Sequence, residues 1–188
     1  MRKMSRGRVV ARSALLDAVW RFPGRERVTI ERGTDAEMAR VDATWRSHRA
    51  PSTAHWQWQT IARQSQEHFL MRCDDCPAAL WAGGRSDVGG PTYALDFLEV
   101  APELRGSGLW GVFALDAICF RAHEAGARRI VFGALPGPAE WYRRYGAADG
   151  APGWRFEPGL APMTIGEQVL IEGTERLHGF REDEEAAT

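Results

Sequence analysis

A glycine-rich turn between an apolar segment and an amphipathic one has the chemistry to bind phosphate groups. The turn is Arg105-Gly106-Ser107-Gly108, and it joins an expected strand, residues 92–100, to an expected helix, residues 108–125. Glycines let the backbone approach a ligand closely, and the start of the helix offers free N–H groups and the positive end of its dipole. This arrangement can hold a pyrophosphate, with Arg105 beside a phosphate oxygen. The alternative is an ordinary strand-to-helix turn.

The same residues resemble a known motif. Val100, Pro102, Arg105, Gly106 and Gly108 match the pattern V-x-P-x-x-R-G-x-G, which is similar to the acetyl-CoA-binding motif of the GNAT acyltransferase superfamily. The segment 139–147 resembles the later A-x-x-[LF]-Y-x-x-x-G-F segment of that family. The resemblance implies transfer of an acetyl group from acetyl-CoA to a primary amine, by direct attack in a ternary complex.

The sequence also differs from the family pattern at a few positions. Trp110 stands where many members have a small residue, with Gly111 one place later. Ala147 replaces the usual Phe, and Pro136 and Pro138 occupy the region where many members have an Asn. Residues assigned to the cofactor on this resemblance are Leu98, Val100, Arg105, Gly106, Ser107, Gly108, Trp110 and Gly111; Leu98 and Val100 would act through main-chain bonds to the pantetheine arm.

Two carboxylates on the expected central strand are candidates for the general base. An amine must be neutral to attack a thioester, so Asp96 or Glu99 would accept its proton, directly or through water. Strict alternation places the two on opposite faces and groups Glu99 with Leu95 and Phe97, although a β-bulge would change this assignment. We favour Glu99. For each carboxylate, the alternative is a solvent-exposed or ion-paired group at a strand end.

A tyrosine on the next helix is the candidate general acid. Tyr142 matches the family's Tyr, which protonates the departing thiolate of coenzyme A in many members. A phenol has a pKa near 10, so this transfer requires local assistance. The competing interpretation is a buried Tyr that only packs and forms hydrogen bonds. Tyr145, three residues later, is the second choice.

Other functions remain open for the same residues. A catalytically silent acyl-CoA-binding sensor is favoured by Pro136 and Pro138, and an acyltransferase for a longer acyl donor would need an apolar tunnel near Trp110 and Phe113. A structural protein would require the glycine turn to be a coincidence. The acceptor should be chosen by the early helices and loops, where Trp45, His55, Trp56 and Trp58 gather. Because Trp56 and Trp58 cannot share one helix face, one should lie in the core and the other be partly exposed, at the acceptor or at a homodimer contact.

Composition limits the broad class. The chain has 188 residues, 44% hydrophobic and 26% charged, with a formal net charge of −1, so no general attraction to nucleic acid or anionic membranes is expected. No apolar run approaches the roughly 20 residues of a membrane span, and no secretory signal is evident, so we expect a cytoplasmic protein. Lys3 is the only lysine, which indicates a GC-rich bacterial genome. Three cysteines, with a single C-x-x-C pair at Cys73 and Cys76, predict neither disulfides nor a metal site.

Strand and helix patterns alternate along the chain and predict an α/β domain, a mixed and splayed sheet flanked by helices. We expect a basic extension over residues 1–26, with a short helix at 13–22, then the GNAT-like domain at 27–172 and an acidic tail at 173–188. Thr34 should cap a helix whose apolar stripe is Met38, Val41 and Trp45. Further expected elements are a helix at 51–66, strands at 27–32, 68–72, 78–82 and 130–132, and two closing strands at 154–156 and 168–171.

Overall fold

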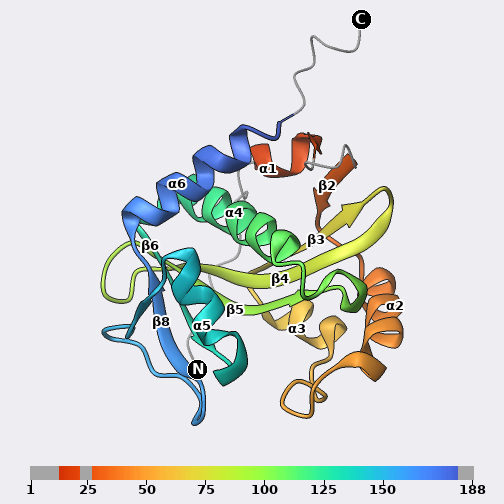
Figure 1. Cartoon of the computed structure of the whole chain (residues 1–188), viewed down its shortest axis with the longest axis horizontal. Helices are drawn as coiled ribbons and strands as arrows, with labels where there is room; N and C mark the ends of the chain where they lie inside the picture. The colour runs from red at the N-terminus through yellow and green to blue at the C-terminus, as the bar shows by residue number, and fades with distance from the viewer. Residues whose placement is uncertain (1–12, 22–26, 182–188) are drawn as a thin grey trace, which may run out of the picture.

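A mixed eight-stranded sheet forms the centre of the computed structural model, which describes residues 13–21 and 27–181 (Figure 1). The strand order is β1-β2-β3-β4-β5-β6-β8-β7, and every neighbouring pair is antiparallel except β5 and β6. The strands are β1 (Trp20–Arg21), β2 (Arg27–Glu31), β3 (Glu67–Cys73), β4 (Cys76–Ser86), β5 (Thr92–Val100), β6 (Arg129–Ala134), β7 (Ala148–Asp149) and β8 (Ala161–Ile165). The expected mixed sheet is confirmed.

Helices cover both faces of this sheet (Figure 1). They are α1 (Ala14–Asp17), α2 (Asp35–Trp45), α3 (Trp58–Gln64), α4 (Leu109–Glu124), α5 (Pro136–Tyr145) and α6 (Glu167–His178), with short 3-10 turns at Arg46–His48 and Pro102–Leu104. Thr34 caps α2 as predicted, in a capping box with Glu37. Among the described residues, no helix is long and apolar enough to cross a bilayer.

Each face of the sheet has its own core. On one face α4 packs Leu115 and Ile118 against strand residues such as Tyr93, and α1, α5 and α6 add to the same cluster. On the other face the predicted stripe of α2, which includes Met38, is buried against α3 and against Leu80 of β4. Strand β5 lies between the two cores, so each β5 side chain packs into one core or the other according to the face on which it lies.

The parallel strands β5 and β6 separate after a short paired stretch. Their pairing is limited to Thr92 with Arg129, Tyr93 with Ile130, and Ala94 with Val131. Beyond Ala94 the two strands no longer pair, although β5 continues to Val100. The expected splay is therefore present, and it opens the sheet at the point where the candidate residues lie.

A β-bulge lies at the beginning of this opening. Ala82 of β4 pairs with Phe97 and Gly83 pairs with Leu95, which leaves Asp96 as the extra residue. Because one extra residue reverses the alternation, Leu95 faces the α4 core, whereas Phe97 and Glu99 lie on the α2–α3 face. Leu98 and Val100 pack with the α4 core. The grouping of Leu95 with Glu99 by strict alternation was therefore wrong.

The structure also corrects several expected helices and strands. Residues 168–171 belong to helix α6, because Leu170, Thr174 and Leu177 recur at helical spacing and are buried on one face. Residues 154–156 lie in a loop, and β7 and β8 are the closing strands. Helix α3 begins only at Trp58, after a series of turns, and the expected helix at 13–22 is reduced to α1.

The described parts of the expected extension and tail pack with the domain. Leu15 and Trp20, before residue 26, and Leu177, after residue 172, are fully buried in the α4 core. Residues 1–12, 22–26 and 182–188, which carry most of the basic extension and the acidic run, lie outside the described residues. The predicted hairpin of β3 and β4 is confirmed, with Asp74 and Asp75 at φ 44° and 70° in the turn.

Candidate active site

The opening between β5 and β6 forms a cleft with two compartments. The larger has a volume of about 730 Å³ and the smaller about 410 Å³. Their walls have six residues in common: Ser52, Trp56, Leu98, Leu135, Pro138 and Tyr142. Since these residues line both spaces, the two compartments are adjacent in this part of the cleft.

The glycine turn lies at the larger compartment. Gly106 and Gly108 line it with φ values of 89° and 75°, and a Cβ added at either would meet no described atom within 4 Å. Glycine is required there by the left-handed backbone, and the space around it is open. Gly108 is the N-cap of α4, and no described side chain bonds to this helix end. The first N–H groups of an α-helix have no partner within the helix, so this end of α4 can bind an anion.

Arg105 lines the larger compartment and also forms three hydrogen bonds within the protein. Its guanidinium donates from Nε to the Val100 carbonyl (2.8 Å), from Nη1 to the His48 carbonyl (3.1 Å) and from Nη2 to Glu99 Oε1 (3.0 Å). These bonds hold the turn against β5 and the end of the 3-10 turn after α2. The guanidinium is thus held in place by the protein. Ser107 Oγ donates to the Leu104 carbonyl (3.3 Å) and likewise stabilises the turn.

Two further cofactor candidates on α4 have packing roles. Trp110 is 7% exposed, lies edge-on to Phe113 (6.3 Å between ring centroids) in the α4 core, and lines neither compartment. Both Trp110 and Phe113, beside which a tunnel was considered, are buried in the α4 core, and neither lines a compartment of the cleft. Gly111 lines the larger compartment, and a Cβ there would come within 2.8 Å of the Trp141 ring, so its small size lets α5 pack on α4.

The edge of β5 supplies backbone groups to the larger compartment. Leu98 and Val100 both line it, and their strand has no partner on the β6 side beyond Ala94. Unpaired peptide groups at a strand edge seek hydrogen bonds. The Val100 carbonyl is already occupied by Arg105, and the other peptide groups of this edge can bond an extended chain, as the resemblance implied for the pantetheine arm.

Asp96 lines the smaller compartment. Its carboxylate is exposed at the bulge and has no hydrogen-bond or ion-pair partner among the described side chains. Partial desolvation by the surrounding protein raises the pKa of this carboxyl above its usual value. A free carboxylate with a raised pKa, next to open space, is suited to accept a proton.

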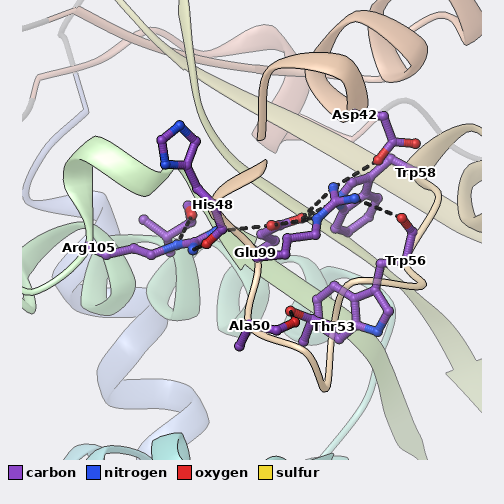
Figure 2. A network of polar contacts seen from close by, with 10 residues as sticks. Asp42, His48, Ala50, Thr53, Trp56, Trp58, Glu99 and Arg105 are labelled. Atoms are coloured by element: carbon purple, nitrogen blue, oxygen red, sulfur yellow. Dashed lines mark hydrogen bonds and ion pairs between the residues drawn. The ribbon is translucent and has the colours of Figure 1, made fainter. Parts of the chain in front are cut away.

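Glu99, the favoured base, lies in a buried polar network (Figure 2). Arg49 donates to it from Nε (3.0 Å to Oε1) and Nη2 (2.9 Å to Oε2), Trp58 from Nε1 (2.6 Å), and Arg105 from Nη2 (3.0 Å). Arg49 Nη2 also lies 2.8 Å from Asp42 Oδ1. The ion-paired alternative is therefore the one that the structure shows, and both carboxylate oxygens accept hydrogen bonds from the protein at the wall of the larger compartment.

Tyr142 lies between the two compartments and is the only tyrosine that lines either. Its ring packs on Phe132 with 4.7 Å between centroids, and no described group forms a hydrogen bond with its phenol. Desolvation raises the pKa of Tyr142 to about 12, so the phenol keeps its proton at neutral pH. Its position fits a proton donor, and its raised pKa increases the local assistance that proton transfer to a thiolate requires.

Tyr145, the second choice for the acid, points away from the cleft. Its hydroxyl donates to Asp116 Oδ1 (2.6 Å) and lies 3.5 Å from Cys119 Sγ. Arg176 of α6 donates from Nη2 to the same Asp116 oxygen (2.8 Å). This cluster joins α4, α5 and α6, so Tyr145 anchors the helix that carries Tyr142.

The early tryptophans divide as expected. Trp58 is fully buried with its indole N–H on Glu99, and Trp45 is buried in the α2–α3 core. Trp56 is half-buried and lines both compartments, and its neighbour His55 lines the smaller one. The loop that contains Trp56 therefore forms one wall of the cleft.

Two contributors to the site were missed by the sequence analysis. Arg144, three residues after Trp141 on the same face of α5, lines the larger compartment with an exposed guanidinium that has no described ion-pair partner. The three-residue spacing could have indicated that Arg144 lies on the same helix face as Trp141. The loop between β7 and β8 places Arg155, Phe156 and Glu157 at the smaller compartment, and no local pattern indicated that. In the described part of the chain, no cluster of three or more His, Cys, Asp or Glu could hold a metal ion.

Solved structures share this architecture. The yncA protein of Salmonella typhimurium, solved with its cofactor acetyl-CoA, aligns at a TM-score of 0.53 and 19% identity, covering 74% of this chain and 94% of that one. A GNAT-family acetyltransferase from Streptococcus pneumoniae aligns at 0.53 and 13%, covering 74% and 98%. Arabidopsis thaliana Naa50, in complex with the bisubstrate analogue CoA-Ac-MVNAL, gives the same values.

Sequence comparisons give no further assignment. No protein-family model matches the chain. No curated protein matches it either. At 13–19% identity, the structural likeness concerns the fold. This chain has the GNAT acetyltransferase fold.

Proposed function

We propose that this protein is an N-acetyltransferase that moves the acetyl group of acetyl-CoA to a primary amine by direct attack in a ternary complex. One observation carries the proposal: Tyr142 stands between two joined compartments, and the free carboxylate of Asp96 lines the smaller one. The larger compartment would hold acetyl-CoA and the smaller would hold the amine. This division accounts for a proton donor near the leaving group and a proton acceptor near the nucleophile.

The fit to acetyl-CoA rests on the larger compartment. Its phosphates would meet the N-terminal end of α4, beside Gly106 and Gly108, with Arg144 as an exposed positive charge. Its pantetheine arm would lie along the unpaired edge of β5. Among structures of the same fold, the Salmonella protein binds acetyl-CoA and the Arabidopsis protein binds a CoA-linked acetyl peptide, which supports a coenzyme A ligand here.

The proposed chemistry balances without any other reactant. The amine nitrogen attacks the thioester carbonyl carbon while Asp96 accepts the amine proton. A backbone N–H at the β5 edge stabilises the oxygen that becomes negative. The C–S bond then breaks and Tyr142 gives its proton to the departing thiolate. Tyr142 afterwards recovers a proton from water, and Asp96 loses one.

The sensor alternative keeps the cofactor site and omits the reaction. One observation favours it: α5 begins Pro136-Gly137-Pro138, and all three line the larger compartment without a polar side chain. Coenzyme A binding without turnover of any amine would support this function.

The test is release of free CoA thiol from acetyl-CoA in the presence of a panel of primary amines. We expect turnover by the wild type and a 10- to 100-fold lower kcat for Tyr142→Phe. Arg143→Ala is the control, since it changes an exposed side chain of the same helix that lines neither compartment, and we expect less than a threefold change in kcat. An unchanged kcat for Tyr142→Phe would contradict its role as acid.

A further inference from the structure

We propose, on the basis of the acetyltransferase function above, that the acceptor is a small monoamine with a flat aromatic body, such as an arylalkylamine, rather than a polyamine or a protein N-terminus. The inference comes from the walls of the smaller compartment. Aromatic side chains from five separate segments of the chain line it: Trp56, Phe97, Phe132, Tyr142 and Phe156.

These rings stand on both sides of the opening. Trp56 and Phe97 meet edge to face, with 5.3 Å between centroids, on the α2–α3 loop and β5. Phe132 and Tyr142 meet at 4.7 Å on β6 and α5. Phe156 comes from the loop between β7 and β8. A flat apolar group between these walls would make offset or edge contacts on each side.

The Trp56 wall is held in place before any ligand binds. Arg49 donates from Nη1 to the Trp56 carbonyl (2.7 Å), and the same guanidinium is fixed by Glu99 and Asp42 (Figure 2). Phe97 also packs against buried Trp58, with 6.3 Å between centroids. A preorganised wall reduces the ordering cost of binding and favours a rigid ligand.

The charges of the compartment fit one ammonium group. Its acidic residues are Asp96 and Glu157, and its basic residue is Arg155, with His55 also on the wall. An ammonium at Asp96 would be attracted by the carboxylate and by the nearby ring faces. A second ammonium on the same molecule would gain little, because Arg155 offsets Glu157.

The volume of about 410 Å³ is at the lower end of the usual range for small-molecule sites. It suits one ring system with a short amine-bearing arm. A peptide N-terminus would require an extended channel to lead its chain away, and a long polyamine would place further charges against the aromatic rings.

The experiment compares 2-phenylethylamine, spermidine and a tetrapeptide with a free N-terminus as acceptors of the wild-type protein. We expect kcat/KM for 2-phenylethylamine to exceed the other two by at least tenfold. Phe156→Ala should raise the KM for 2-phenylethylamine about tenfold and leave the KM for acetyl-CoA unchanged. Phe180→Ala, a half-buried aromatic residue outside the cleft, is the control and should change neither KM.

Calorimetry separates the failure of this proposal from failure of the proposed function. Binding of 2-phenylethylamine to the protein saturated with free CoA is measured for the wild type and for Phe156→Ala. Binding that weakens about tenfold in Phe156→Ala supports the aromatic site even if no amine is turned over. Equal or better use of spermidine or the tetrapeptide, or no effect of Phe156→Ala on either measurement, would overturn the proposal.

Discussion

Asp96 and Glu99 lie three residues apart on β5, but their surroundings are opposite. Asp96 is the extra residue of the bulge, exposed at the smaller compartment and without a described partner. Glu99 is 6% exposed and accepts bonds from Arg49, Arg105 and Trp58. One carboxylate is available to a substrate, whereas the other joins three segments of the protein.

This comparison shows that residue type and strand position do not identify a general base. A carboxylate that accepts several charged hydrogen bonds is held in place by its partners, and its oxygens are occupied by the protein. A carboxylate beside open space, with its pKa raised by desolvation, can exchange protons with a ligand. The structural role of Glu99 also serves the site, because its network connects the glycine turn at Arg105 to the loop at Trp56.

The largest expected effect comes from removing the buried carboxylate. Glu99→Ala removes the acceptor of the Trp58 indole and one acceptor each of Arg49 and Arg105. Removing one partner of a buried ion pair typically costs about 3–5 kcal/mol. We expect the free energy of unfolding, measured by urea denaturation, to fall by about this amount. Asp96→Ala is the matched control and should leave it nearly unchanged. A loss below about 1 kcal/mol for Glu99→Ala would contradict the stabilising role of the Glu99 network.

The exposed carboxylate should show the reverse pattern. Asp96→Asn keeps the shape of the side chain and removes its ability to accept a proton, so kcat should fall by about 100-fold. Its Tm and its affinity for acetyl-CoA should not fall. Steady-state kinetics and thermal unfolding measure both quantities. Full activity in Asp96→Asn would show that another group, or water alone, takes the proton.

A smaller effect is expected at the cofactor end of the cleft. Arg144→Ala should weaken binding of coenzyme A by about five- to tenfold, because Arg144 is an exposed charge on the larger compartment and Arg105 is engaged elsewhere. Arg143→Ala is the control, since Arg143 lies on the same helix, pairs with Asp149 and Glu140, and does not line the cleft. Equal losses in the two variants would indicate a general charge effect.

The smallest effect is a dependence of stability on pH. The pKa of Asp96 is raised in the folded protein, so the folded state binds a proton more tightly than the unfolded state. The carboxyl therefore destabilises the fold as pH rises through the unfolded and then the folded pKa. We expect Asp96→Asn to have a slightly higher Tm than the wild type at pH 7 and the same Tm near pH 3. A lower Tm at pH 7 would indicate that the charged carboxylate has a stabilising partner.

Much of the fold could be predicted because its signals are local. The capping residue Thr34, the two-residue hairpin at Asp74-Asp75 and the turn at Gly106 and Gly108 each depend on neighbouring residues alone. Helix α6 was missed because a short apolar run such as 168–171 is typical of both strands and helices. Its buried Leu177 lies beyond that run, at helical spacing.

The site could be predicted only in part, because some of its determinants are distant in sequence. Tyr142 and the glycine turn were found from their motifs. The bulge at Asp96 depends on the register with β4, and the burial of Glu99 depends on Arg49, fifty residues earlier. The sequence of β5 alone indicates neither the register with β4 nor the bond from Arg49. Tertiary packing therefore determines the different surroundings of Asp96 and Glu99.

The most direct test of the account is calorimetric titration of the wild-type protein with acetyl-CoA, beside Gly108→Glu and Gly90→Glu. Both glycines have positive φ, 75° and 105°, and open space for a Cβ, but only Gly108 lines the cleft. We expect a dissociation constant of about 1–100 μM for the wild type and for Gly90→Glu, and no measurable binding for Gly108→Glu. Absence of binding to the wild type, or equal binding by Gly108→Glu, would contradict the assignment of the larger compartment to acetyl-CoA.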